Sequence, residues 1–182
     1  IPEGTEVCHG DCKSIARRLI VRERLELTTA DFLVAVTRDE HTLEYMTPAE
    51  RADPELRLAA VRFSGSSIQF LSPEERADPT IRLAAVTQNG YAIRHLKPEE
   101  RTDPALRLAA VSQDSEAIHC LKPEERTDPA LRLAAVENNG LAIAWLSPDE
   151  RADPTLQLAA IRRNSGAIRW LTTVEMFDLA EK

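Results

Sequence analysis

The stretch LKPEERTDPALRLAAV occurs twice in this sequence, at residues 96–111 and at residues 121–136. Close copies begin at Met46, Leu71 and Leu146. Every copy contains an Asp-Pro pair, and the five pairs stand at residues 53–54, 78–79, 103–104, 128–129 and 153–154. Each pair follows the previous one by 25 residues without insertion. A fixed period of this size is the signature of a repeat array, so the sequence predicts a solenoid.

The Asp-Pro pair marks the start of a helix in each unit. Asp78 is a good N-cap, and Pro79 stands at the first helical position, where a missing N–H costs nothing. We expect this helix to end at Asn89-Gly90, because both residue types tolerate a left-handed cap. A second short helix that carries Ile93 should follow, and then a charged turn.

The charged turn has capping-box spacing in three units. The Ser or Thr is followed three residues later by Glu in the pairs Thr47 and Glu50, Ser72 and Glu75, and Ser147 and Glu150. Lys97 and Lys122 replace the Ser or Thr in the two identical copies. The turn therefore does not depend on a side-chain cap alone.

The first helix of each unit is apolar around most of its surface, as in RLAAV at residues 107–111. Such a helix is typical of a buried element, so we expect it to form a middle layer between its neighbours. An arginine recurs on this helix at positions 57, 82, 107 and 132. Because buried arginine needs a carboxylate partner, we expect these arginines to form an ion-pair ladder with the glutamates of the turns. Gln157 replaces the arginine in the last unit, where TTVEMF also replaces the charged turn.

These patterns predict an all-α fold, an α-solenoid of about six 25-residue repeats with two helices and a short helical turn per unit. We divide the chain into four segments. They are an N-terminal tail (1–14), an N-terminal cap half-repeat (15–27), the six-unit array (28–177) and the end of a C-terminal cap (178–182).

The composition limits the functions that fit this chain. Its 182 residues carry a formal net charge of −7, which argues against a protein that mainly holds phosphate backbones or an anionic membrane. No apolar run reaches the roughly 18 residues of a membrane span. Three cysteines are too few for a disulfide framework, so we expect a cytoplasmic protein. Because the chain begins at Ile1, a fragment of a larger or secreted protein is also consistent.

Two families of repeats resemble this sequence. The pattern D-x-x-x-x-L-A-A-V-x-x-N-G-x-A-I at residues 78–93 resembles a bacterial repeat family of unknown function whose units read L-A-A-V-x-x-N-G-x-A-L. That resemblance covers about residues 28–171 and implies a helical repeat array within a larger bacterial protein, with no site residues to transfer. The Asp-Pro starts are also similar to leucine-rich-variant repeats, which alternate an α-helix with a 3₁₀ turn.

The second resemblance raises the question of a cofactor. Leucine-rich-variant proteins can hold an iron–sulfur cluster on cysteines ahead of the repeats. Only Cys8 and Cys12 precede the repeats here, and such a cluster needs four ligands. We therefore expect no cofactor and no metal. CHGDC at residues 8–12 is interpreted as part of a loose N-terminal segment rather than a zinc site.

Candidate partner-binding residues are those that vary between units. One column reads Tyr45, Phe70, His95, Cys120, Trp145 and Trp170, and the more exposed column beside it reads Gln69, Arg94, His119, Ala144 and Arg169. The first column flanks the buried face, so it is either boundary packing or an aromatic binding ridge. The residues that follow the first helix also vary, and they should lie on a different edge of the solenoid.

We predict a non-enzymatic protein–protein interaction scaffold. Its candidate contact residues are Tyr45, Phe70, His95, Trp145, Trp170, Arg94, His119 and Arg169. A nucleic-acid reader is the alternative, and its local support is Arg94, Arg162, Arg163 and Arg169. An enzyme or metal site at His95, His119 and Cys120 is the third hypothesis, because a Cys near a His suggests either a nucleophile pair or part of a metal site.

Overall fold

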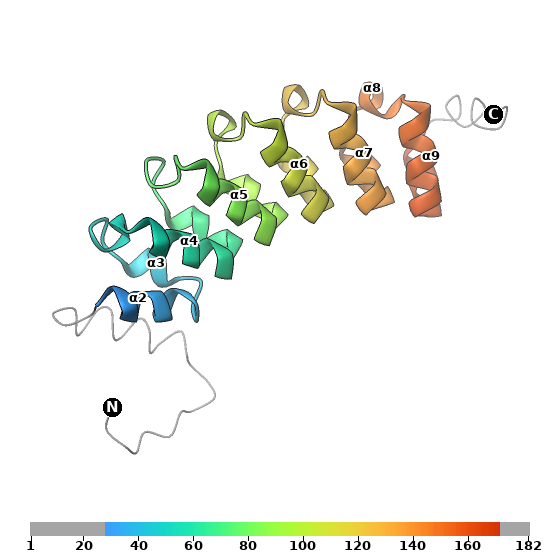
Figure 1. Cartoon of the computed structure of the whole chain (residues 1–182). Helices are drawn as coiled ribbons and strands as arrows, with labels where there is room; N and C mark the ends of the chain where they lie inside the picture. Colours follow the sequence, from blue (N-terminus) through green and yellow to red (C-terminus); the bar gives the residue numbers. More distant parts are fainter. Residues whose placement is uncertain (1–27, 172–182) are drawn as a thin grey trace, which may run out of the picture.

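The computed structural model describes residues 28–171, and within that range every regular element is helical. Figure 1 shows the units stacked side by side in a curved row. The predicted all-α solenoid is therefore confirmed. The predicted tail (1–14) and N-terminal cap (15–27) lie outside the described residues, as does the end of the chain from residue 172.

Each unit contributes one α-helix to a first layer and one 3₁₀ helix to a second layer. The α-helices are α2 (Thr29–Val36), α4 (Pro54–Phe63), α5 (Pro79–Gln88), α6 (Pro104–Gln113), α7 (Pro129–Asn138) and α9 (Pro154–Arg163). The second layer consists of η2 (Gly65–Phe70), η3 (Gly90–His95), η5 (Ser115–Cys120), η7 (Gly140–Trp145) and η8 (Ser165–Trp170), with the short α-helix α3 (Thr42–Tyr45) at its start. The connecting turns include η1 (Glu50–Ala52), η4 (Pro98–Glu100), η6 (Pro123–Glu125) and α8 (Pro148–Arg151).

The predicted helix starts are confirmed. In α5 the Asp78 side chain accepts a hydrogen bond of 2.8 Å from the N–H of Thr80, and Pro79 is the first helical residue. The same Asp cap and first-turn Pro begin α4, α6, α7 and α9. A 25-residue period in the sequence thus becomes a repeated helix start in the structure.

The prediction of a left-handed cap at Asn-Gly was wrong. Asn89 is extended (φ −145°, ψ 104°), and its side chain accepts a hydrogen bond of 3.1 Å from the N–H of Tyr91. It is therefore the N-cap of η3. A Cβ on Gly90 would overlap the carbonyl oxygen of Ala110 in the next unit, closer than real Cβ contacts come. Glycine is needed here for close packing between units and not for a positive φ.

The second layer is built on a three-residue period. Gly90, Ile93 and Leu96 are three residues apart and all buried, and a helix with 3.0 residues per turn places such residues on one side. A six-residue 3₁₀ helix is long for its type, so packing against the α layer must stabilise it. The second helix that the sequence predicts is this 3₁₀ segment.

The predicted contacts of the first helix, with its own second helix and with the equivalent helices on both sides, are confirmed, but its burial on all sides is not. Helix α5 packs against α4 and α6 on its two sides, and against η2 and η3 on a third side. Ile81, Ala85 and Val86 face this interior. No described element covers the fourth side, which leaves Leu83 46% exposed. The array has two layers, and one surface of the α layer is open to solvent.

A glutamate in each turn joins two consecutive units. One carboxylate oxygen of Glu100 accepts a hydrogen bond of 2.6 Å from the N–H of Lys97 at the start of its own turn. The other oxygen accepts a hydrogen bond of 2.7 Å from Nε of Arg76 in the preceding unit. Because the N–H rather than the side chain of Lys97 makes this bond, lysine replaces Ser or Thr at that position without loss of the turn.

The same ion pair recurs along the array. Its members are Arg51 with Glu75 (3.0 Å), Arg76 with Glu100 (2.7 Å), Arg101 with Glu125 (2.7 Å) and Arg126 with Glu150 (3.2 Å). The side chains of Arg101 and Glu125 are only 7% and 10% exposed. A buried ion pair of this kind specifies geometry, because either charge left alone in the interior is costly.

The ladder uses a different arginine from the one that the sequence suggested. Arg57, Arg82 and Arg107, on the α-helices, donate to backbone carbonyl oxygens, such as that of Glu100, which accepts from Arg82 at 2.6 Å. Gln157 donates to the carbonyl of Arg151 at 2.9 Å. An amide can serve in the last unit because the acceptor is a carbonyl and needs no positive charge.

Truncation of one ladder member should destabilise the fold. In Glu125→Ala the guanidinium of Arg101 stays buried without its carboxylate, so we expect a loss of about 3 kcal/mol in the free energy of unfolding. Glu124→Ala is the matched control, because that neighbouring carboxylate is exposed, and it should change stability by less than about 0.5 kcal/mol. Urea unfolding followed by circular dichroism measures both, and equal losses would contradict the ladder.

The ladder also predicts a dependence of stability on pH. Burial alone raises the pKa of Glu100, but hydrogen bonds from Arg76 and Lys97, with their charges, lower the pKa below its ordinary value of 4.5. A carboxyl group whose pKa is depressed by folding stabilises the fold above the unfolded pKa and loses that contribution as pH falls. We expect the free energy of unfolding to decrease below about pH 4.5.

The variant Glu100→Gln isolates this effect. It should be less stable than the wild type at pH 7 and should lose less stability on acidification. Glu99→Gln, an exposed neighbour in the same turn, should keep the wild-type dependence. Urea unfolding at a series of pH values measures all three, and parallel curves for Glu100→Gln and the wild type would refute the prediction.

Candidate interaction surface

The open side of the α layer carries a regular apolar surface. Outward positions on each α-helix are separated by three, four and seven residues, as in Thr80, Leu83, Ala84 and Thr87 of α5. We call the surface formed by the two central columns the leucine face. Its leucine column is Leu33, Leu58, Leu83, Leu108, Leu133 and Leu158, and the column beside it is Val34, Ala59, Ala84, Ala109, Ala134 and Ala159.

The exposure of this face is substantial in the middle of the array. Leu83 and Leu108 are 46% and 41% exposed there, and Val34 in the first described unit is 49% exposed. Leu58 and Leu133 are partly buried and contact the core. Large contiguous apolar patches on a protein surface mark interaction sites, whereas single exposed leucines do not. The repeat places one leucine per unit in a row, and Leu83 and Leu108 are its most exposed members.

Hollows separate the helices of the leucine face. One hollow, of about 270 Å³, lies between α5 and α6 and is lined by Leu83, Leu106, Arg82, Glu100 and Asp103, among others. A second hollow, of about 390 Å³, lies between α4 and α5 and is also lined by Leu83. Both hollows are open to solvent, so a side chain of a partner could reach them from outside.

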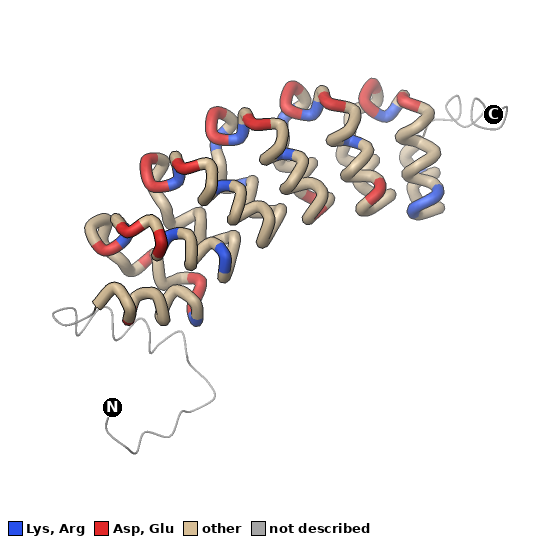
Figure 2. Tube along the Cα trace, viewed as in Figure 1, with Lys and Arg blue, Asp and Glu red and all other residues tan. Residues whose placement is uncertain are grey.

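A row of carboxylates borders the leucine face. The capping residues Asp78, Asp103 and Asp128 are exposed, and so are the first acidic residues of the turns, Glu74, Glu99, Glu124 and Asp149. Figure 2 shows these acidic turns along the outer edge of the curved array. The arginines of the same turns are largely buried in ion pairs, and Lys97 and Lys122 are the exposed cations there. We call this edge the acidic margin.

The predicted aromatic column lies in the 3₁₀ layer and not on the leucine face. Tyr45, Phe70, Cys120 and Trp145 are partly buried and pack against the core. Trp145 also meets the ring of His119 edge-on, with ring centroids 6.2 Å apart. These contacts place the column at the boundary of the core, which was one of the two interpretations that the sequence allowed. They leave less of each aromatic ring for a partner.

Two other members of that column differ in exposure. His95 is half-buried, while Trp170 is 42% exposed in the last described unit. The neighbouring column is more open, because Gln69, Arg94, His119 and Arg169 are all exposed. Ala144 in the same column is partly buried.

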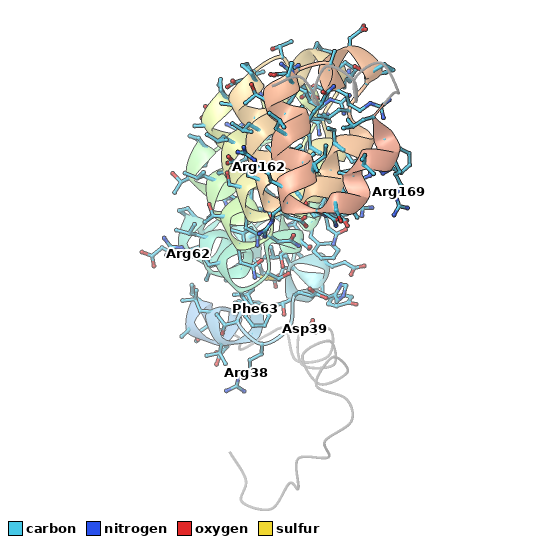
Figure 3. All side chains as sticks on the ribbon, turned by 90° about the vertical axis from the view of Figure 1, so that its right-hand side faces the viewer. Arg38, Asp39, Arg62, Phe63, Arg162 and Arg169 are labelled. Carbon is cyan, nitrogen blue, oxygen red and sulfur yellow. The ribbon has the colours of Figure 1, made fainter. Side chains whose placement is uncertain are left out.

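The arginines that could contact nucleic acid do not converge. Figure 3 shows Arg169 on one side of the molecule and Arg162 toward the other, where Arg62 of the same variable column also lies. The Arg94 guanidinium lies over the ring of Tyr91, 5.0 Å from its centroid. The two variable surfaces therefore occupy different edges of the array, as the sequence predicted.

The residues at the C-terminal ends of the α-helices help to stack the units. The Gln88 side chain accepts a hydrogen bond from the N–H of Gly65 (2.6 Å) and donates to the carbonyl of Phe63 (3.2 Å), both in the preceding unit. Gln113 makes the same two bonds one unit later, to Gly90 and Gln88. These variable positions therefore have a structural role that the sequence did not reveal.

Three observations concern the third hypothesis, a site at His95, His119 and Cys120. Within residues 28–171 no three His, Cys, Asp or Glu side chains lie close enough to hold a metal ion. Burial raises the pKa of the Cys120 thiol, whereas a nucleophilic cysteine needs a lowered one. Burial, then Arg94 and Arg76, lower the pKa of His95, which favours a neutral ring. The motif at residues 8–12 lies outside the described residues.

Comparison with known proteins adds one match. The sequence profile of a family described as a domain of unknown function, DUF4116, matches residues 53–101. That range runs from the cap of α4 to the turn after η3, which is close to two periods of the repeat. Neither the curated proteins nor the solved structures contain a match. In the part of the chain described here, no helix has the length and apolar character needed to cross a membrane.

The leucine face should contribute little to folding. Leu106 and Leu108 lie two residues apart on α6, but Leu106 is 4% exposed and Leu108 is 41% exposed. We expect Leu106→Ala to lower the free energy of unfolding by about 3 kcal/mol and Leu108→Ala by about 1 kcal/mol or less. Urea unfolding measures both variants. A loss in Leu108→Ala as large as that in Leu106→Ala would show that the exposed leucine is needed for folding.

Proposed function

We propose that this protein is a non-enzymatic protein–protein interaction scaffold whose leucine face is the partner-binding surface. The observation that supports this proposal is the row of partly exposed leucines, one per unit, on a side of the α layer that no described element covers. An apolar row of this extent has an unfavourable contact with water, and binding of a partner removes it.

On this surface the constant columns would provide affinity for a partner, and the variable column beside them would provide selectivity. The leucine and alanine columns are nearly constant, so they offer the same apolar contact in each unit. The outward column at the end of each α-helix is exposed and variable, and it consists of Thr37, Arg62, Thr87, Ser112, Glu137 and Arg162. In repeat proteins, variable exposed positions on a constant frame choose the partner. This column is adjacent to the leucine face and is therefore well placed to do so.

The nucleic-acid alternative has weaker support. Arg51, Arg76, Arg101 and Arg126 are paired with glutamates, and Arg57, Arg82 and Arg107 donate to carbonyl oxygens, so these cations already have partners within the protein. A phosphate backbone needs a row of free cations, whereas the edge beside the leucine face carries carboxylates. The proposal for a protein partner follows from this difference in charge.

Capture with matched surface variants tests the proposal. The wild-type chain, the variant Leu83→Gln with Leu108→Gln, and the variant Arg94→Gln with His119→Gln are immobilised and exposed to a lysate of the cells that produce the protein. Mass spectrometry should find proteins that the wild type and the second variant retain and that the leucine variant loses at least tenfold. Circular dichroism checks that all three are folded.

Two outcomes would count against the proposal. Loss of the retained proteins in the Arg94 and His119 variant alone would move the binding surface to the 3₁₀ layer. Recovery of nucleic acid that is lost steeply as salt is added would favour the nucleic-acid alternative.

A further inference from the structure

We infer that the partner of the leucine face is a cationic amphipathic α-helix that lies across the α-helices of the array. This inference rests on the proposed function and specifies the chemistry of the partner. Four features of the described surface lead to it: the lack of hydrogen-bonding groups at its centre, the spacing of its leucines, its hollows and the charge of its margin.

The centre of the leucine face favours a helix over an extended peptide. An extended backbone exposes N–H and C=O groups that must find partners when they leave water. The central columns consist of leucine and alanine with one valine, whose side chains neither donate nor accept hydrogen bonds. A helix satisfies its own backbone groups, so it can cover this surface at no such cost.

The spacing of the leucines matches a heptad. Packed helices are roughly 8–10 Å apart, so the leucines of successive units are separated by about that distance. Seven residues of an α-helix rise about 10.5 Å. A partner helix that crosses the array therefore meets one unit with each heptad. Its apolar side chains can enter the hollows between α4 and α5 and between α5 and α6, both of which are lined by Leu83.

The acidic margin sets the charge of the partner. The exposed residue Asp103 lines the same hollow as Leu83, so a carboxylate and the leucine row lie within reach of one partner helix. The exposed carboxylates of Asp78, Asp103 and Asp128 repeat in register with the leucines. Lysine or arginine on one flank of the partner helix, once per heptad, complements this row and increases the rate of association.

Synthetic peptides test the inference on the whole chain. The probe has about three heptads with leucines on one face and lysines on one flank, which spans about three units. A scrambled peptide of the same composition keeps the charge but loses the amphipathic face. Fluorescence anisotropy should show that the probe binds at least tenfold more tightly than the scrambled peptide. Equal binding of the two would overturn the inference, because it would reflect charge alone.

Two sets of variants assign the contact to the leucine face and to its margin. Leu83→Gln with Leu108→Gln should weaken probe binding at least tenfold, while Arg94→Gln with His119→Gln should not. Asp78→Asn, Asp103→Asn and Asp128→Asn together keep the N-caps, because Asn caps as well as Asp, and remove three charges. This triple variant should bind several-fold more weakly, with a shallower dependence on salt. An unchanged affinity in either the leucine or the triple variant would overturn the inference.

Photo-cross-linking tests the orientation. A benzophenone group is placed at one of three probe positions, each seven residues from the next, and the cross-linked peptides are mapped by mass spectrometry. A helix that crosses the array should attach through successive positions to successive units, such as α5, α6 and α7. Attachment of all three positions to the same pair of helices would refute the crossing orientation.

These measurements separate this inference from the proposed function. If native proteins are lost from the leucine variant but the probe behaves like its scrambled control, the scaffold proposal stands and the helical partner is wrong. If no native protein depends on Leu83 and Leu108 while the probe binds as expected, the surface has the inferred chemistry and the scaffold proposal is wrong.

Discussion

One carboxylate per unit joins that unit to the preceding one in this array. The two oxygens of Glu125 serve two units, since one accepts from the N–H of Lys122 in its own turn and the other pairs with Arg101 in the preceding unit. In all four pairs of the ladder the glutamate lies 24 residues beyond the arginine, and an insertion that displaced the turn would leave a buried charge without a partner. This requirement gives a physical reason for the unbroken 25-residue period of the sequence.

Uniform stacking has a consequence for the surface. Every unit places the same leucine at the same height on the α layer, so Leu83 and Leu108 lie in a row although neither is needed to build the core. The second layer covers only one side of the α layer, and the other side is left open. The ion pair that joins consecutive units thus also helps to set the spacing of the leucine face. The acidic margin follows from the same repeat, because the N-cap of each α-helix is an aspartate.

The sequence predicted the local features of the fold well and its side-chain contacts less well. N-caps, first-turn prolines and capping boxes depend on neighbours within a few residues. Asp78 and Pro79 therefore predict the start of a helix regardless of what that helix packs against. The ladder joins residues 24 apart. The motif contains two arginines, Arg76 and Arg82, and the sequence does not show which of them pairs with the glutamate of the next turn. Similarly, Gly90 is explained by the carbonyl of Ala110 in the next unit, which no local pattern contains. Of the site, the sequence predicted two separate variable edges but not the leucine face.

By itself, the sequence determined the all-α class, the period and the start of each α-helix, because these depend on backbone preferences and on repetition. Only the tertiary structure decided which side of an all-round apolar helix is covered. A helix such as residues 104–113 can bury either of its apolar sides, and the choice depends on where the 3₁₀ layer packs. The packing of the 3₁₀ layer buries Leu106 and exposes Leu108. A leucine that is present in every repeat therefore lies on the surface.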